Sequence, residues 1–171
     1  MTSSDEILSG QVTQIGDRID EDALRAAVGT NSDYYLARWN EMQAKGSRVS
    51  WNWAACLANL YWLAWRKMWA PLTLLVVAFV LVGIVGALLP ALAQATLLIS
   101  IGFTFVTGAY GNEIYRRHCE RLVAGTAGLE GEEALAGLRR RGGTSAAALA
   151  VTIAATLLLI GLPMALQIAQ T

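Results

Sequence analysis

The chain has 171 residues, of which 55% are hydrophobic, and its mean hydropathy of +0.44 lies above the usual range of a soluble globular domain. Its 13 Lys and Arg residues balance 13 Asp and Glu residues, so no overall charge attracts nucleic acid. The two cysteines, Cys56 and Cys119, form no C-x-x-C pair, so neither a disulfide framework nor a zinc knuckle is indicated.

Residues 1–19 are polar with few apolar positions, and we expect them to form a flexible N-terminal segment. They are acidic where a secretory signal would be basic and then apolar, which predicts that the soluble N-terminal part stays in the cytoplasm. Residues 20–49 are expected to form a cytoplasmic helical module that packs on the membrane, on the spanning helices or on a partner.

Capping residues divide this module into two short helices. Asp20 can cap residues 21–28, and Gly29 is a helix stop. A second helix is expected from 33 to 45, capped by Asn31 or Ser32 and ended by Gly46. One face of this second helix carries the apolar side chains Tyr35, Trp39 and Met42.

Residues 50–69 contain five of the chain's tryptophans and predict an interfacial or re-entrant helix. Residues 51–65 are uncharged but too few to cross a bilayer, and Asn52 and Asn59 need polar partners there. A ligand-stacking aromatic cage is the alternative, but no acidic residue among the rings favours a bound cation. The predicted membrane-interface residues are Trp51, Trp53, Tyr61, Trp62, Trp65, Arg66, Lys67 and Trp69.

Two long segments contain no Asp, Glu, Lys, Arg or His: residues 68–112 and the C-terminal part from Ser145 onward. A spanning helix needs about 20 apolar residues to cross roughly 30 Å of hydrocarbon. Residues 70–111 therefore predict a transmembrane hairpin with its turn at Pro90, and residues 146–167 a third transmembrane helix, followed by an external tail at 168–171. The buried core of a soluble helical protein is the alternative, although such helices usually carry a polar stripe.

Residues 112–145 form a charged cytoplasmic connector between the second and third spans. The segment 113–123 extends the second span into water and ends at Gly125, and a short helix follows with acidic residues first and arginines last. Gly142 and Gly143 stop that helix, and Thr144 or Ser145 caps the third span. The candidate lipid-headgroup residues are Arg116, Arg117, Arg139, Arg140 and Arg141, for which simple positive-inside anchorage is the alternative reading.

The distribution of Lys and Arg predicts how the chain is threaded. Basic residues precede the first span and fill the connector, whereas the turn 88–94 and the tail carry none. Because basic loops are retained in the cytoplasm, the N-terminus is expected inside and the C-terminus outside.

The order of several short motifs resembles an uncharacterised bacterial membrane family catalogued as domain of unknown function 2628. One departure is the segment CLANLYW at 56–62, where such sequences often have aromatic residues and a Gly-Pro pair. The resemblance implies a small protein of the bacterial inner membrane and brings no known activity. Together with the spans and the threading predicted above, it makes the chain a multi-pass protein whose C-terminus is expected in the periplasm. It is carried by Tyr34, Tyr35, Leu36, Trp39, Ser47, Val49, 50–55, 62–69, Gly111, Asn112, 115–118 and 141–145.

Signs of enzymatic chemistry are sparse, and we expect a non-catalytic protein without metal or cofactor. His118 is the single histidine and lacks convergent ligands, so it is read as an interfacial residue at the foot of the second span. No nucleotide-binding loop is present, since the sequences GTAG and GGTS lack the lysine or strand that such loops need.

Small residues on the spans instead suggest function by association, because they let helix backbones approach closely in lipid. The first hypothesis is an accessory or scaffolding subunit that binds another integral-membrane protein or itself. The alternatives are an oligomeric channel or carrier lined by Gln94, Thr96, Ser100 and Thr104, and a protein that binds anionic membrane lipid. The predicted helix-association residues, whose other reading is packing within the chain, are Ser100, Thr104, Thr107, Gly108, Gly111, Ala148, Thr152 and Ala155.

Overall fold

The computed structural model describes residues 21–126, 128–129 and 131–168, and every regular element in these ranges is helical. The predicted all-α class is therefore confirmed for this part of the chain. The predicted flexible segment 1–19 and residues 169–171 of the predicted tail lie outside it. A helix at 21–28 is followed by α2 (Ser32–Ala44), α3 (Trp53–Trp65), α4 (Trp69–Leu88), the short 3-10 helix η1 (Pro90–Leu92), α5 (Ala93–Ala124), α6 (Gly131–Arg141) and α7 (Ala146–Ile168).

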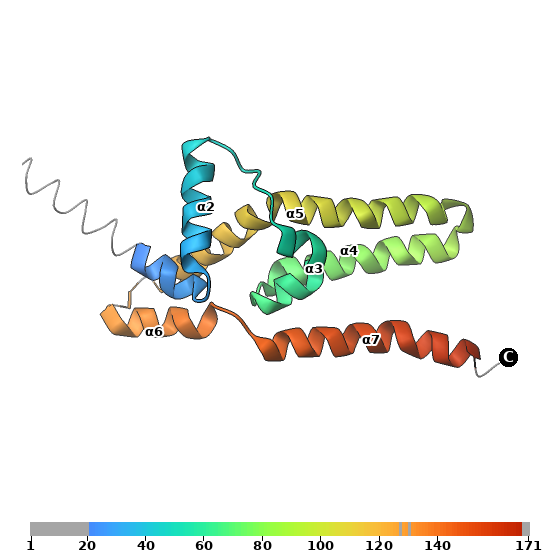
Figure 1. The fold of residues 1–171 in the computed structure, drawn as a ribbon. Coiled ribbons are helices and arrows are strands. Elements are labelled where there is room, and N and C mark those ends of the chain that lie inside the picture. Colours follow the sequence, from blue (N-terminus) through green and yellow to red (C-terminus); the bar gives the residue numbers. More distant parts are fainter. Residues whose placement is uncertain (1–20, 127, 130, 169–171) are drawn as a thin grey trace, which may run out of the picture.

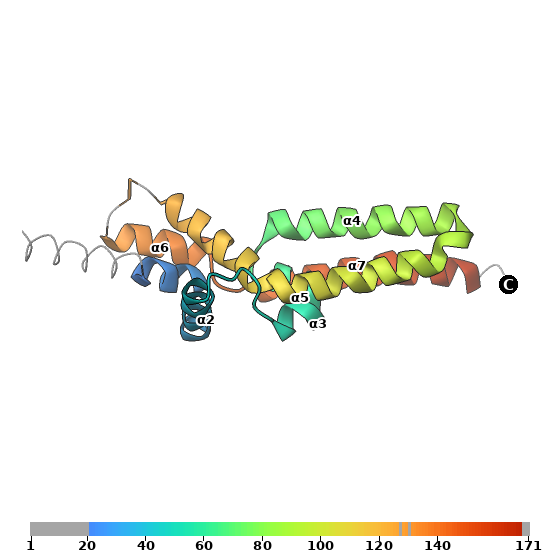
Figure 2. The same ribbon diagram turned by 90° about the horizontal axis from the view of Figure 1, so that it is seen from above.

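The helices divide into a long apolar part and a group of short polar helices. In Figure 1, α4, the first part of α5 and α7 extend in one direction from a group formed by helix 21–28, α2 and α6. The view from above in Figure 2 shows the same division, with α3 at the boundary. At about 1.5 Å per residue, the 32 residues of α5 make a helix roughly 48 Å long, which is enough to belong to both parts.

Two helical stretches are long and apolar enough to cross a membrane. They are Trp69–Leu88, which is α4, and Gly131–Leu159, whose apolar part is α7. Few of their residues are buried within the chain, and side chains such as Leu74 and Leu158 are largely exposed. Both helices are therefore compatible with insertion into a membrane.

Helices α4 and α5 form an antiparallel hairpin, and its turn lies at Pro90, as predicted. The Phe79 and Phe103 rings meet edge to face with their centroids 5.5 Å apart. Further from the polar helices, a Cβ atom on Gly86 would lie 2.9 Å from the Thr96 hydroxyl oxygen. The two helices thus stay in contact along most of the length of α4.

The tryptophan-rich segment forms α3, which packs against α4, α5 and α7. Asn52 caps α3 by accepting a hydrogen bond from the Ala55 backbone N–H. A φ angle of 40° at Asn59 kinks the helix within residues 56–62, the segment that differs from the usual sequence of the family it resembles. A Cβ on Gly111 would lie 2.6 Å from the Ala55 Cβ, so α3 contacts α5 where α5 has no side chain. This close approach is the main attachment of α3.

The polar helices share an aromatic core with the last part of α5. Helix α2 buries Tyr35, Leu36, Trp39 and Met42, which confirms the predicted apolar face. The Tyr115 ring of α5 meets the Tyr35 ring with 4.7 Å between centroids, and it lies 5.8 Å from the Trp39 ring. The module therefore folds onto the extension of α5 beyond the apolar hairpin.

Predicted helix boundaries agree closely with these elements. α5 continues beyond the apolar segment to Ala124 with Gly125 as its C-cap, and α6 ends in Arg139, Arg140 and Arg141. The Ser145 hydroxyl accepts a hydrogen bond from the Ala148 backbone N–H at 3.1 Å, as expected of a residue that caps α7.

Candidate functional site

The most heavily built polar site is the junction where α3 ends and the polar helices begin. Arg66 follows α3 and is only 3% exposed. Its Nη1 atom donates to the backbone oxygens of Val28 and Thr30, at 3.3 and 3.2 Å, and to the Tyr115 hydroxyl at 3.2 Å. Helix 21–28 thus ends on a buried cation, which suits the negative end of a helix dipole.

No carboxylate of the described residues pairs with Arg66, so aromatic rings carry much of its stabilisation. The guanidinium carbon lies 4.6 Å from the Tyr35 ring centroid and 4.9 Å from that of Tyr115. Desolvated cation–π contacts of this kind stabilise by about 2 kcal/mol or more each. Burial also raises the pKa of the Tyr115 hydroxyl, so this ring stays neutral.

Lys67 caps the C-terminal end of α6 in the same way as Arg66 caps that of helix 21–28. Its backbone has a φ angle of 55°, which turns the chain sharply between α3 and α4. Its Nζ donates to the backbone oxygens of Arg140 and Gly142, at 3.1 and 2.7 Å. Two consecutive cations therefore cap the C-termini of two different helices.

The connection from α6 to α7 contacts the backbone of helix 21–28 at two glycines, Gly142 and Gly143. The Gly143 N–H donates to the Ala27 oxygen at 2.8 Å, and the Ser145 N–H donates to the Trp65 oxygen at 2.9 Å. A Cβ on Gly142 would lie 2.1 Å from the Ala27 oxygen, so only glycine allows this approach.

A second polar cluster joins α2, the loop before α3, and α5. The Asn112 side chain is fully buried and accepts from Asn52 Nδ2 at 2.9 Å while donating to the Ser50 hydroxyl at 3.0 Å. The Trp39 indole N–H donates to the Asn112 backbone oxygen at 3.0 Å. Buried amides with this many partners fix the relative position of the segments that hold them.

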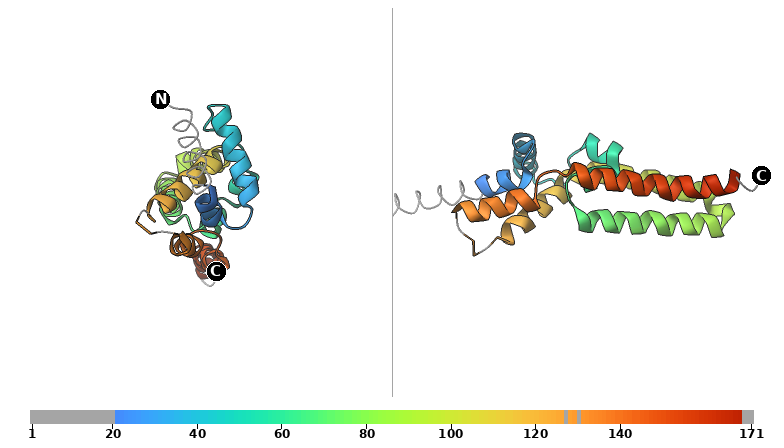
Figure 3. Two further views of the ribbon diagram at one scale, coloured as in Figure 1. Left: turned by 90° about the vertical axis from the view of Figure 1, so that its left-hand side faces the viewer. Right: turned by 90° about the horizontal axis from the view of Figure 1, so that it is seen from below.

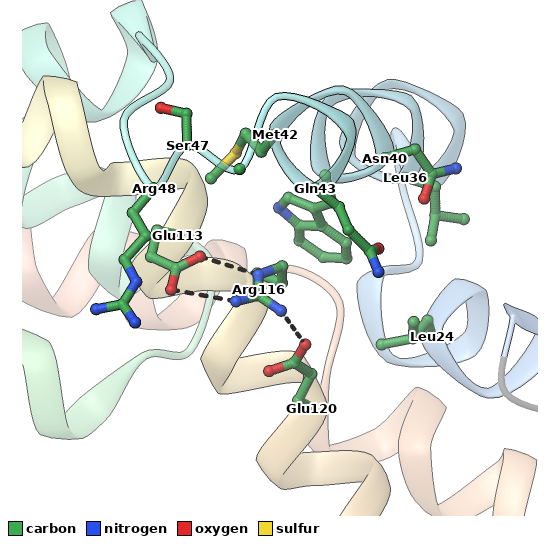
Figure 4. A pocket seen from close by; sticks show the side chains of 12 residues that line it. Leu24, Leu36, Asn40, Met42, Gln43, Ser47, Arg48, Glu113, Arg116 and Glu120 are labelled. Carbon is green, nitrogen blue, oxygen red and sulfur yellow. Dashed lines mark hydrogen bonds and ion pairs between the residues drawn. The ribbon is translucent and has the colours of Figure 1, made fainter.

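Acidic and basic side chains on α5 line a pocket of about 450 Å³ against α2 (Figure 4). Glu113 accepts from Arg116 and Arg117, with nitrogen to oxygen distances of 2.9 and 2.7 Å, and it is 5% exposed. The hydrogen bond from Arg116, followed by that from Arg117, holds the pKa of Glu113 below its ordinary value. The opposite wall combines apolar side chains such as Leu36 and Met42 with polar ones such as Gln43.

The predicted membrane-interface residues fall into different environments. Trp53 and Trp69 are exposed, at 67% and 56%, as an interfacial position requires. Trp51, Tyr61, Trp65 and Lys67 are half-buried. Trp62 and Arg66 are buried within the chain: Trp62 packs on Tyr115, and the Nη1 atom of Arg66 donates to groups inside the chain.

The predicted association residues on α5 also divide. Thr107, Gly108 and Gly111 are buried, and the two glycines contact Cys56 and Ala55 of α3. Ser100 and Thr104 are half-buried, and each donates its hydroxyl to a carbonyl of its own helix. The inner part of this face thus packs within the chain, as the alternative reading had it.

On α7, Ala148 is buried, Thr152 is half-buried and Ala155 is exposed. Among the helices whose bounds are given above, α7 contacts only α3. As far as Leu159, where the described side chains of α7 end, the face that begins at α3 therefore continues without a partner helix.

The candidate headgroup arginines are mostly occupied. Arg116 binds both Glu113 and Glu120, and Arg139 binds Glu132. Arg140 and Arg141 are exposed at the end of α6. Arg117 binds Glu113 through Nε while its side chain remains 51% exposed.

No group of three metal-ligating side chains occurs in the described part of the chain. His118 is half-buried, and burial and then the charge of Arg121 lower its pKa. Cys119 is fully buried, which raises its pKa to about 12. The Cys119 thiol therefore stays protonated at neutral pH, which makes it a poor nucleophile.

Sequence reasoning missed the roles of Tyr115, Asn112 and Gly142, although all three lie within the family motifs. The available signal was an amide, Asn112, at the end of an uncharged segment with an aromatic residue, Tyr115, shortly after it, since amides in such a segment must find partners within the chain.

Comparison with known proteins identifies one family. A family model described as "Protein of unknown function (DUF2628)" matches residues 20–121, which is more than half of the chain. The matched range contains all the residues described above around Arg66. No curated protein and no solved structure matches the chain.

Proposed function

The chain belongs to the DUF2628 family of proteins of unknown function, and from its own residues we propose that it is a non-catalytic membrane protein that acts by association. It has three spanning helices, α4, α5 and α7, and serves as an accessory or scaffolding subunit of a larger assembly in the bacterial inner membrane. The polar helices form its cytoplasmic module.

The case for α5 as a spanning helix rests on its pairing with α4. Residues 93–112 contain no Asp, Glu, Lys, Arg or His, and at about 1.5 Å per residue they cover roughly 30 Å. The Phe79–Phe103 contact and the Gly86–Thr96 approach hold this length against α4. If α4 lies in hydrocarbon, its antiparallel partner lies there as well.

The orientation follows from where the cations gather. Arg66, Lys67, Arg117 and Arg121 all lie at the end of the hairpin that joins the module, whereas the turn at η1 carries no charge. The positive-inside rule places the module in the cytoplasm and the η1 turn on the periplasmic side.

The single observation that carries association is the isolation of α7. It contacts α3 near Ala148, and α3 lies only at the inner end of the hairpin, so the outer part of α7 has no partner among the helices described (Figure 3). Thr152 and Thr156 donate their hydroxyls to the carbonyls of Ala148 and Thr152, at 2.8 Å each. The exposed face therefore consists of small side chains, and the hydroxyl groups on it already have hydrogen-bond partners.

A face of this kind suits another membrane helix. In lipid, ordinary apolar side chains gain little by leaving acyl chains for protein, whereas small side chains allow close backbone approach and dispersion contacts. We therefore expect a spanning helix of another integral-membrane protein to pack on Thr152 and Ala155, outward from α3.

Extraction of the full chain from native membranes in a mild detergent, followed by native mass measurement, tests this proposal. The expected result is a particle larger than one chain that contains a second protein. The double variant Thr152→Leu, Ala155→Leu should lose that protein, because leucine side chains hold the helix backbones apart.

Ala150→Leu is the matched control, since Ala150 is also exposed on α7 and lies nearly opposite this face at 100° per residue. It should leave the particle unchanged. A particle of single-chain mass in every mild detergent, or equal behaviour of the two sets of variants, would refute association through this face.

A further inference from the structure

A second feature of the spanning part is an apolar pocket between α4 and α5. Its volume is about 240 Å³, and nearly all of its lining is apolar. α5 contributes Phe103, Val106, Thr107 and Ile114, while the opposite wall is formed by Leu63 of α3 and by Pro71, Leu74, Leu75 and Ala78 of α4. The Thr107 hydroxyl donates to the Phe103 backbone oxygen at 2.7 Å, so the pocket presents no unsatisfied donor at this position.

The dimensions of the pocket match one leaflet of a bilayer. Phe103 and Ile114 are separated along α5 by about 16 Å at 1.5 Å per residue, and half of a 30 Å hydrocarbon layer is about 15 Å. The antiparallel contact of Phe79 with Phe103 places Trp69 level with Glu113, since each is ten residues further toward the module. The pocket thus occupies the cytoplasmic leaflet under the membrane placement proposed above.

Two arginines continue the same face of α5 beyond the pocket. At 100° per residue, Arg117 and Arg121 share the direction of Phe103, Val106 and Ile114 within about 60°. Arg117 lies about 6 Å beyond the level of Trp69, which is within the headgroup layer. Side chains of a helix lean toward its N-terminus, and α5 runs toward the cytoplasm, so both arginines lean back toward the membrane.

Both arginines also have donors to offer. Arg117 uses its Nε on Glu113, and neither of its Nη atoms has a hydrogen-bond partner in the part of the chain described. Arg121 is exposed, and its Nε donates to the Arg117 backbone oxygen at 3.1 Å. No carboxylate of the described residues forms an ion pair with Arg121, whereas Arg116 and Arg139 are bound by acidic side chains.

We infer that this face of α5, together with α4, binds one anionic phospholipid of the cytoplasmic leaflet. One acyl chain lies in the pocket between Phe103 and Ile114, and Arg117 and Arg121 hold the headgroup phosphate. The site rests on the membrane placement in the proposed function but is independent of association through α7.

A larger pocket, which lies between α2 and α5, is less suited to an anion. The 450 Å³ pocket beside α2 is lined by two arginines, Arg48 and Arg116, and by two glutamates, Glu113 and Glu120, so its charges cancel. The arginines above the α4–α5 pocket retain a net positive charge.

Native mass spectrometry of the full chain in detergent tests the site with two lipids that have the same acyl chains, dioleoyl-phosphatidylglycerol and dioleoyl-phosphatidylcholine. The chain should bind one phosphatidylglycerol molecule with a preference of roughly 30-fold, the factor expected for two cations near a membrane surface. The variant Arg117→Gln, Arg121→Gln should bind both lipids alike. Ala78→Phe, which fills the pocket, should weaken both lipids.

Matched variants separate a defined site from general attraction. The double variant Arg139→Gln, Arg140→Gln removes two cations outside the site and should leave the preference for phosphatidylglycerol unchanged. Ala87→Phe is the control for Ala78→Phe, because it adds the same ring at an exposed position of α4 outside the pocket. The lipid site would be overturned if both arginine double variants lost the preference for phosphatidylglycerol equally. It would also be overturned if the Arg117 and Arg121 variant kept that preference, or if the wild-type chain showed none. Failure of the wild-type chain to sediment with membranes would instead refute the membrane placement itself.

Discussion

The tightest backbone approach in the junction yields a sharp prediction about Gly142. A Cβ at this position would lie 2.1 Å from the Ala27 oxygen, 2.8 Å from its carbonyl carbon and 3.0 Å from its Cα. All three are backbone atoms of helix 21–28, and the adjacent Gly143 N–H donates to the same Ala27 oxygen at 2.8 Å. Gly142→Ala therefore cannot be accommodated by the rotation of a side chain.

The expected cost has two parts. Overpacking a well-filled site destabilises by about 1–3 kcal/mol. Separating α6 from helix 21–28 by the 1 Å or so that the methyl group needs also weakens the Gly143 to Ala27 hydrogen bond, at about 1 kcal/mol. For a chain of this length a loss of roughly 2–4 kcal/mol corresponds to a fall in Tm of about 5–15 °C.

Thermal unfolding of the full chain in detergent, followed by circular dichroism and tryptophan fluorescence, measures this shift. Gly137→Ala is the matched control, because Gly137 lies inside α6 and a Cβ atom added there would meet no neighbouring atom within 4 Å. That variant should raise stability by about 0.5–1 kcal/mol through helix propensity. A Tm for Gly142→Ala equal to that of the wild-type chain would refute the close approach of α6 to helix 21–28.

Two further predictions concern titratable groups near the foot of α5. Since the pKa of Glu113 is lowered in the folded chain, its stabilisation is complete above the ordinary value of 4.5 and is lost as the pH falls through the lowered pKa. Glu113→Gln should cost about 1–2 kcal/mol at neutral pH and flatten the acid side of the stability profile, unlike Glu133→Gln at an exposed position. Burial raises the pKa of Cys119 to about 12, so its thiol should react slowly with iodoacetamide. In a Cys56→Ser variant, labelling followed by mass should be at least 100-fold slower at neutral pH for the folded chain than after denaturation. Rapid labelling of the folded variant would contradict the burial of Cys119.

Helix positions could be predicted from the sequence because their signals are local. The uncharged segments, Pro90, and the glycines at 46 and 125 are sufficient to locate α4, the end of α2 and the end of α5. Capping by Ser145 also follows from residues adjacent in sequence. Local patterns of this kind do not depend on which other helix lies nearby.

The environment of Arg66 could not be predicted in this way. An Arg-Lys pair beside tryptophans at the end of an uncharged segment has the composition of a headgroup anchor, and composition does not say where the donors go. In the structure, helix 21–28 and Tyr35 return to this point from earlier in the chain and supply the carbonyl oxygens and the ring face. The partners of Arg66 are therefore long-range in sequence, and a pattern of neighbouring residues does not contain them.

The junction and the free face of α7 together determine how association could affect the module. At its inner end α7 is fixed by the Ser145 to Trp65 hydrogen bond and by the contact of Ala148 with α3, while its outer part lacks a partner helix among those described. A partner that packs on Thr152 and Ala155 therefore binds beyond the junction and breaks none of the hydrogen bonds of Arg66 or Lys67. Any effect on the module passes either through the contact of α7 with α3 or through the short connection at Gly142 and Gly143, where helix 21–28 leaves no room for displacement toward it.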